Sequence, residues 1–330
     1  MQAQDYSMAK WAIGVRLPGS NEQSIEAAIG RADILRTHLL RPTWHFVAAE
    51  DICWLLELTA SQIKAAQSSR DRDLELTEAV YLKSNTIIEK ALSTGEHLTR
   101  EELIARLQKA GIATNQNRAS HLFARAELEK FICSGATRDG KTTYALLSKR
   151  VQKTRELTKE EALAELAIRY FTSRGPASEQ DFRWWSGLST RDANHAVELV
   201  KSDLILEKID GRTYWLMPGF IAPRSSQASA LLLPTYDEFI ISYTDRSPSI
   251  PAQLESHMKE ISDRGVFRPI IVVNGQVAGI WKRTINKDTL IVEIQHFTQV
   301  NQSIVDLIHQ AAAQFGYFLD KKVEVRRASI

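Results

Sequence analysis

Cysteines and long apolar runs are scarce in this sequence, and their scarcity excludes whole classes of protein. The 330 residues include only two cysteines, Cys53 and Cys133, too few for a disulfide framework or a four-cysteine zinc site. No apolar run approaches the roughly 20 residues that span a bilayer. The start also lacks the basic cluster and apolar stretch of a secretory signal. We therefore expect a reduced, cytoplasmic protein with no membrane partner.

Motifs for nucleotides, nicotinamide cofactors and catalytic zinc are also missing. The chain has no phosphate-binding glycine loop, no dinucleotide fingerprint, no zinc-protease helix signature and no nucleophile elbow. Its eight histidines are dispersed along the chain. The sequence thus predicts no cofactor, no bound nucleotide and no metal site.

Charge is nearly balanced overall, with 42 lysines and arginines against 40 aspartates and glutamates. Its distribution is uneven, because residues 98–156 contain 12 basic and 6 acidic side chains. A local excess of this kind can bind the phosphate backbone of a nucleic acid. It can also be no more than a solvated charged face, and composition alone leaves both interpretations open.

Two segments follow one plan of three helices and a β-hairpin. In the first, Thr99 and Glu102 form a capping box at the start of the middle helix, and Asp139-Gly140 favours a tight hairpin turn. The expected helices are 79–92, 99–110 and 117–131, and the expected strands are 131–134 and 142–147.

The second segment repeats this order, with a capping box at Thr158 and Glu161 and a turn at Asp210-Gly211. The expected helices are 158–173, 178–185 and 190–201, and the expected strands are 204–209 and 213–217. Three helices followed by a hairpin is the winged-helix plan, in which the third helix enters the major groove of DNA while the hairpin, or wing, meets the backbone. Winged helices also serve as protein-interaction scaffolds.

Candidate DNA-contacting side chains lie on the polar faces of the two third helices and in the first wing. They are Asn117, Arg118, His121, Arg125, Arg138, Lys141, Arg191, Asn194 and Lys201.

The two ends of the chain differ from this plan. The N-terminal third is a partial copy, with a short helix at 24–31, strands at 34–38 and 43–47, and a helix from 51 to about 66. After a linker-like stretch at 223–226, we expect strands at 230–233, 238–241, 269–273, 276–281 and 290–295, a helix at 304–315 and a last strand at 322–326. Asn274-Gly275 marks a hairpin between two of these strands.

The predicted fold class is therefore α+β. It consists of three tandem winged-helix domains, the first truncated at its N-terminus, and a C-terminal, mainly antiparallel β subdomain with one helix. The predicted domains are residues 1–70, 71–155, 156–222 and 223–330.

The strands at 34–38 and 43–47 carry an unusual set of polar side chains. Within each extended strand, Arg36 and His38 share a face, as do Thr43 and His45. With bulky apolar residues on the opposite side, these side chains could line an anion-binding pocket. A partly exposed strand with satisfied polar groups is the alternative.

Two adjacent carboxylates, Asp237 and Glu238, stand in another expected strand. Neighbouring strand residues point to opposite faces, so the pair is not expected to act as one catalytic dyad. We expect a structural role instead, such as an ion pair with Arg246.

Four blocks of the sequence keep one order along the chain: MQAQDYSMAKWA, LRTHLLRPTWHFVAAEDICWLL, LLPTYDEFIISYTDRS and NGQVAGIWKRT. They resemble the winged-helix DNA-binding proteins that include the AlkZ-like and YcaQ-like DNA glycosylases. The resemblance covers nearly the whole chain. It implies three tandem winged helices, a C-terminal β subdomain, and activity on bulky alkylated purines or interstrand crosslinks in double-stranded DNA.

The resemblance also implies a catalytic motif. The AlkZ-like branch carries Gln-apolar-Gln in its active site, whereas in the YcaQ-like branch the second position is Asp; Gln2, Ala3 and Gln4 match the first branch. Glutamine cannot act as a general base, but it holds water through one donor and one acceptor. An N7- or N3-alkylated purine is already an activated leaving group, so water placement matters more than strong base catalysis.

In an extended segment Gln2 and Gln4 project to the same side. On spacing alone they could be a pair of surface glutamines; the resemblance makes them the predicted catalytic residues, with Arg36, His38, Thr43 and His45 as the predicted pocket wall. In relatives a few dozen helical residues precede this stretch, so we expect that the start of the chain was assigned late. The alternative is a non-catalytic, regulatory winged-helix protein, which an incomplete first domain would favour.

Overall fold

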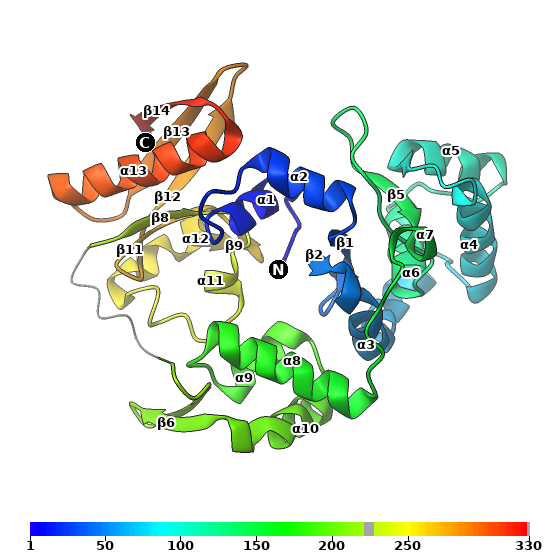
Figure 1. Ribbon diagram of the computed structural model, residues 1–330, viewed down its shortest axis with the longest axis horizontal. Helices are drawn as coiled ribbons and strands as arrows, with labels where there is room; N and C mark the ends of the chain where they lie inside the picture. The colour runs from blue at the N-terminus through cyan, green and yellow to red at the C-terminus, as the bar shows by residue number, and fades with distance from the viewer. Residues whose placement is uncertain (221–227, 329–330) are drawn as a thin grey trace. The chain divides into compact units, whose positions relative to one another are not determined.

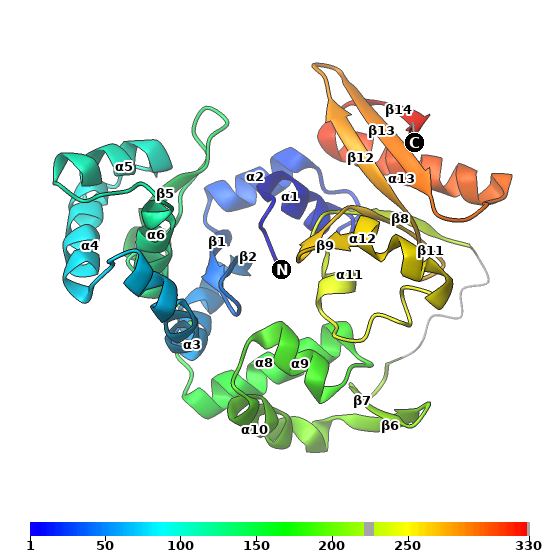
Figure 2. The same cartoon turned by 180° about the vertical axis from the view of Figure 1, so that it is seen from behind.

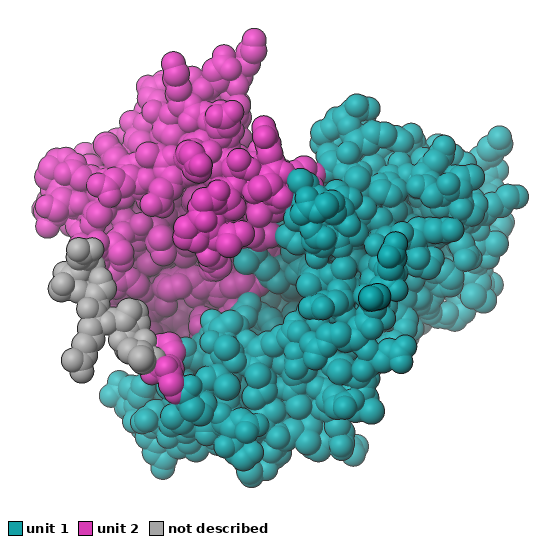
Figure 3. All heavy atoms as spheres, in the orientation of Figure 1, with its two compact units in different colours: residues 1, 27–218 teal, residues 2–26, 219–330 magenta. Residues whose placement is uncertain are grey.

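The chain, drawn as a ribbon in Figure 1, divides into two compact units by its internal contacts (Figure 3). The structure is a computed structural model that describes residues 1–220 and 228–328. Unit 1 comprises Met1 and residues 27–218, and unit 2 comprises residues 2–26 and 219–330. The expected linker at 223–226 lies outside the described residues. Within those residues, no helix has the length and apolar character needed to cross a bilayer.

Unit 1 begins with a two-stranded antiparallel sheet and a long helix. Strand β1 (Ile34–Leu39) pairs with β2 (Thr43–Ala48), and the 3-10 helix η1 (Ala49–Asp51) leads into α3 (Ile52–Asp73). Both expected strands are confirmed. Helix α3 continues past the expected end near residue 66 to Asp73.

The first copy, residues 78–146, has the predicted three helices and two strands, with a short additional strand. Its elements are α4 (Glu78–Leu92), β3 (Leu98–Thr99), α5 (Arg100–Lys109), α6 (Arg118–Leu128), β4 (Ile132–Ser134) and β5 (Thr143–Leu146), followed by α7 (Leu147–Arg150). The strands form one sheet in the order β3-β5-β4. The capping box of Thr99 and Glu102 is confirmed. Helix α6 begins after Asn117, not at it, because Asn117 adopts a left-handed conformation with φ 71°.

The second copy, residues 159–216, repeats this order with a simpler sheet. It contains α8 (Lys159–Arg174), α9 (Glu179–Ser186), α10 (Thr190–Val200), η2 (Lys201–Asp203), β6 (Ile205–Ile209) and β7 (Arg212–Leu216). The turns Asp139-Gly140 and Asp210-Gly211 both have positive φ at their two central residues. This is the turn geometry that favours Asp-Gly in two-residue hairpins, and both predicted hairpins are confirmed.

Unit 2 is a sheet covered by a long helix, together with the first helix of the chain. Its elements are α1 (Tyr6–Gly14), β8 (Ala230–Leu233), α11 (Glu238–Ile241), η3 (Ala252–His257), α12 (Met258–Ile261), β9 (Ser262–Asp263), β10 (Val266–Phe267), β11 (Ile270–Val273), β12 (Gln276–Ile285), β13 (Thr289–His296), α13 (Gln302–Leu319) and β14 (Lys322–Arg327). Helix α2 (Glu22–Gly30) crosses the boundary between the units.

The main sheet of unit 2 has the strand order β14-β13-β12-β11-β8. All neighbours in it are antiparallel except β13 and β14. Those two are parallel because α13 carries the chain back across the sheet between them. Helix α13 covers one face of the sheet (Figures 1 and 2). The α+β class and the mainly antiparallel character of this region are confirmed.

Helix α1 packs into the core of unit 2. The Trp11 ring centroid lies 4.9 Å from that of Phe315 and 5.3 Å from that of Phe318, and the Trp11 indole N–H donates to the Leu232 carbonyl at 2.7 Å. Gly14 permits this approach, because a Cβ there would lie 2.5 Å from the Phe318 ring. The first helix is thereby fixed to strands more than 200 residues later in the chain.

The expected strand at 238–241 is wrong. These residues form the short helix α11, and the Asp237 side chain accepts a hydrogen bond from the Phe239 amide at its N-terminus. The run Phe239-Ile240-Ile241 has the apolar character of a buried strand. Asp237 reverses that expectation because an aspartate at this position stabilises the first turn of a helix.

Candidate active site and nucleic-acid interface

The two candidate catalytic glutamines precede the first helix and do not lie within it. Helix α1 starts at Tyr6, where the Asp5 carboxylate accepts a hydrogen bond from the Met8 amide at 3.0 Å. Gln2 is only 8% exposed, whereas Gln4 is exposed. The backbone before α1 is therefore non-helical, which the prediction that the two side-chain amides act together requires. The two glutamines differ strongly in how much of each is exposed.

A buried carboxylate holds the backbone at Gln2. Glu238 Oε1 accepts a hydrogen bond from the Gln2 amide N–H at 2.8 Å, and Glu238 Oε2 accepts one from the Ser242 hydroxyl at 2.7 Å. Glu238 is 7% exposed, and Ser242 is fully buried. Hydrogen bonds to a desolvated charged group are among the stronger ones in proteins. Glu238 thus anchors the start of the chain within unit 2.

The neighbouring carboxylate, Asp237, has a different partner from the one expected. It accepts two hydrogen bonds from the Arg16 guanidinium at 2.7 and 2.8 Å, whereas Arg246 Nε donates to the Ile240 carbonyl. Burial acts to lower the pKa of Arg16, but the hydrogen bond and charge of Asp237 outweigh it and the pKa is raised. Asp237 and Glu238 therefore hold the chain on both sides of α1.

The β1–β2 register divides the predicted pocket wall between two faces. Residues directly opposite each other in an antiparallel pair project to the same side of the sheet. His38 pairs with Trp44, whereas Thr37 pairs with His45. One face thus carries Arg36, His38, Trp44 and Phe46, and the other carries Thr37, Leu39, Thr43 and His45. The expectation of one polar and one apolar side is wrong, because the hairpin turn sets the register and the sequence pattern does not show it.

His38 is oriented by a buried carboxylate that the sequence analysis missed. Glu127, which is fully buried on α6, accepts from the His38 amide at 2.9 Å and lies 2.5 Å from His38 Nδ1 through the same oxygen, Oε2. The His38 ring also packs on Trp44, with centroids 4.1 Å apart. Because a carboxylate oxygen accepts, Nδ1 is the nitrogen that donates in this contact. The signal for Glu127 was a charge beside the apolar face of α6.

The other predicted wall residues differ in accessibility. The Arg36 guanidinium lies over the Trp44 ring, 4.2 Å from its centroid. His45 is 1% exposed, and its Nδ1 is 3.0 Å from the Thr43 carbonyl oxygen. Burial of His45 makes it a group that fixes the strand, whereas Arg36 and His38 are only partly buried.

The basic side chains of α6 are engaged by acidic and carbonyl groups. Arg118 donates to the carbonyls of Ala113 and Leu74, and His121 Nδ1 lies 2.7 Å from Asp71. Arg125 donates to Glu129 and Glu78, and its side chain is only 12% exposed. These contacts within unit 1 stabilise it.

The remaining DNA candidates are more exposed. Arg138 lies in the first wing and donates to Glu102 on α5, and Lys141 in the same wing is exposed. In the second copy, Arg191 and Asn194 are exposed on α10. Lys201 is also exposed and pairs with Glu198.

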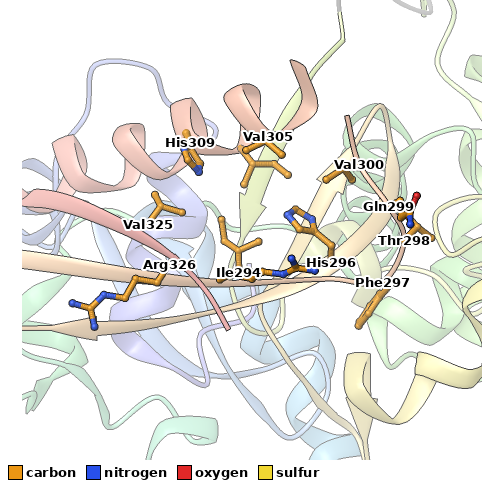
Figure 4. A pocket seen from close by; sticks show the side chains of 12 residues that line it. Ile294, His296, Phe297, Thr298, Gln299, Val300, Val305, His309, Val325 and Arg326 are labelled. Carbon is orange, nitrogen blue, oxygen red and sulfur yellow. The ribbon is translucent and has the colours of Figure 1, made fainter. Parts of the chain in front are cut away.

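A pocket of about 680 Å³ opens beside α13 in unit 2 (Figure 4). Its lining combines apolar side chains with His296, His309 and Arg326, and includes none of the predicted site residues. Burial and the charge of Arg327 lower the pKa of His296, and within residues 1–220 and 228–328 its buried Nδ1 has no hydrogen-bond partner. In that same part of the chain, no cluster of three or more His, Cys, Asp or Glu side chains is arranged to hold a metal ion.

Comparisons with known proteins place this geometry in a family. A family model described as DNA glycosylase AlkZ-like matches residues 1–318. Among solved structures, the chain is similar to the DNA glycosylase AlkZ of Streptomyces sahachiroi, with 20% sequence identity and a TM-score of 0.78 over 99% of this chain and 91% of that chain. A search of the curated proteins found no match. The family match extends over nearly the whole chain, and this protein belongs to the AlkZ-like DNA glycosylase family.

Proposed function

We propose that this protein is a monofunctional DNA glycosylase that hydrolyses the N-glycosidic bond of a bulky alkylated purine, or unhooks a purine crosslink, in double-stranded DNA. The observation that carries the proposal is the Gln-Ala-Gln segment, which lies outside any helix and is held at Gln2 by the buried carboxylate of Glu238. Family membership supplies the reaction class.

In this proposal, Gln2 and Gln4 position the attacking water. Each amide offers a hydrogen-bond donor and an acceptor but has no basic pKa. That suffices for a purine alkylated at N7 or N3, because the positive ring is a good leaving group and the remaining task is to place water and stabilise the sugar cation. No cofactor or metal ion is part of this mechanism.

The pocket wall is proposed to include Arg36, His38, Thr43 and His45. The two faces of the hairpin divide these roles: His38 and Arg36 contact the substrate, whereas Thr43 and the buried His45 maintain the strand. Bulky or crosslinked lesions are hydrolysed without full extrusion of the base, in contrast to most glycosylases.

DNA binding is proposed to use three tandem winged helices in residues 1–70, 71–155 and 156–222, with residues 223–330 as the C-terminal domain. The order of elements in the first and second copies supports this division. The proposed direct contacts are the exposed Arg138, Lys141, Arg191 and Asn194. Arg118, His121 and Arg125, which bind carbonyls and carboxylates of unit 1, are proposed to support the DNA-binding surface. A cytoplasmic location is part of the same proposal.

Base release from defined duplexes tests the activity. The substrates are oligonucleotides with one N7-methylguanine or one N7-benzylguanine, and the freed base is quantified against an enzyme-free control for spontaneous loss. We expect release by the wild-type protein and a loss of about 10- to 100-fold in Gln2→Ala and in Gln4→Ala, with duplex binding retained. Tight duplex binding with no release from either substrate would indicate the non-catalytic, regulatory alternative.

A further inference from the structure

We infer that Glu238 is a positioning residue for the Gln2–Gln4 segment, and this inference rests on the proposed glycosylase function. Water placement by amides requires that their backbone be fixed, because a displacement of about 1 Å can cost about 100-fold in rate. Glu238 accepts the hydrogen bond from the backbone amide of the first of the two glutamines.

The geometry distinguishes positioning from direct catalysis. Both carboxylate oxygens of Glu238 accept hydrogen bonds from the protein, one from the Gln2 amide and one from Ser242 one turn along α11. The bond to Ser242 orients the carboxylate from its own helix, and the bond to Gln2 transmits that orientation to the start of the chain. Glu238 acts through Gln2 in this arrangement and contacts the backbone, not the reacting atoms.

Helix α1 has anchors of its own. Asp237 binds Arg16 just beyond the end of α1, and the Trp11 indole binds the Leu232 carbonyl in its middle. Before the helix, Met1 pairs with Phe46 through two backbone hydrogen bonds, and Glu238 holds the Gln2 amide. Loss of Glu238 therefore removes the hydrogen bond at Gln2 without unfolding α1.

Three substitutions separate geometry from charge. Glu238→Gln keeps an acceptor for the Gln2 amide and removes the charge, whereas Glu238→Asp keeps the charge and withdraws the acceptor by one methylene group. Glu238→Ala removes both. The matched control is Glu260→Ala, because the Glu260 carboxylate also binds two side chains of unit 2, His257 and Gln295, without contacting Gln2.

Single-turnover release of N7-alkylguanine is measured for each full-length variant, together with duplex affinity and thermal unfolding. We expect Glu238→Ala and Glu238→Asp to slow release by about 10- to 100-fold, with duplex affinity and cooperative unfolding maintained. Glu238→Gln should recover most of the wild-type rate, and Glu260→Ala should match the wild type.

Each contrary result has its own meaning. A Glu238→Gln variant as slow as Glu238→Ala, beside a fast Glu238→Asp, would overturn positioning in favour of an electrostatic role. Wild-type release with Glu238→Ala unchanged would overturn the inference alone. A wild-type protein that releases no base would remove the proposed function itself. If Glu238→Ala unfolds, the Gln and Asp variants still decide between geometry and charge.

Discussion

The first copy (78–146) and the second copy (159–216) share one order of elements but present different surfaces. In the first, strands β4 and β5 are wholly buried and join a third strand. In the second, β6 and β7 form a two-stranded hairpin with a single bridge from Trp215 to Ala177, and every residue of β6 is exposed. The third helices also differ: the basic side chains of α6 bind acids and carbonyls, whereas α10 exposes Arg191 and Asn194.

The difference shows why a local excess of basic residues does not identify a DNA-binding surface. Residues 98–156 carry the excess in the sequence, yet Glu57, Asp71 and Glu78, which precede that segment, bind its Lys130, His121 and Arg125. Neutralisation from outside the segment reduces the field that a phosphate would experience. The second copy, which looked weaker in charge, offers the more accessible third helix.

The largest expected effect is a difference between the two copies in how much a substitution lowers the free energy of unfolding. Phe123 is fully buried in the first copy and stacks on Tyr144, with ring centroids 4.9 Å apart. Phe123→Ala should lower the free energy of unfolding by about 3–5 kcal/mol, because it leaves a cavity. Ile209→Ala in the exposed second wing should change it by less than about 0.5 kcal/mol. Urea unfolding measures both, and equal losses would show that the two hairpins are equally structural.

DNA binding sharpens the comparison further. Arg191→Ala should reduce the slope of log affinity against log salt by about 1, as expected for the loss of one phosphate contact. Arg125→Ala should leave that slope unchanged and lower stability by about 1–3 kcal/mol, because it breaks a partly buried charged hydrogen bond to Glu129 and an exposed one to Glu78. Fluorescence anisotropy across a salt series gives the slopes. A reduced slope for Arg125→Ala alone would reverse the assignment.

A smaller effect concerns pH and the base of the first wing. The Ala136 amide donates to His97 Nδ1, and burial, with the charge of Arg150, lowers the pKa of His97. The unfolded chain then binds the proton more readily, so the contribution of His97 to stability is lost as pH falls below about 6.5, the unfolded value. His97→Gln retains an acceptor and does not titrate.

We therefore expect the melting temperature to fall less between about pH 7.5 and 5.5 in His97→Gln than in the wild type, by about 1–3 °C. Differential scanning calorimetry at the two pH values measures the difference. Identical pH dependence of the two proteins would show that His97 is not a source of acid instability.

The smallest effect uses Cys133 as a probe of the first copy. This thiol is fully buried in β4, and burial raises its pKa to about 12. In a Cys53→Ser background, labelling of the native protein should therefore be slow at neutral pH, and Phe123→Ala should accelerate it. Mass spectrometry follows the modification. Rapid labelling without any destabilising substitution would mean that the first copy opens readily.

Local features of the fold were predicted well from the sequence. The capping boxes at Thr99 and Thr158 and the hairpin turn at Asn274-Gly275 are all present. Each depends on hydrogen bonds between residues a few positions apart, so the information lies within the window that the pattern covers. The wrong prediction of a strand at 238–241 also arose from neighbouring residues. The helix cap at Asp237 and the apolar run that follows it favour different structures for the same four residues.

Long-range partners of the candidate site could not be predicted in this way. Asp237 has Arg16 as its partner at a separation of 221 residues, and nothing in the local pattern favours Arg16 over Arg246. Glu127 likewise orients His38 from 89 positions away. Such pairs are selected by packing, because a buried carboxylate must be matched by whichever donor the fold brings beside it.

By itself, the sequence determined the helices of the two copies, the turns and the family motif with its two glutamines. Tertiary structure decided that residues 2–26 pack with residues 219–330, that Glu238 holds Gln2, and that acids outside the basic segment bind some of its basic side chains. The physical reason is range: caps and turns are set by neighbours in the chain, whereas burial and charge pairing depend on which distant surfaces exclude water together.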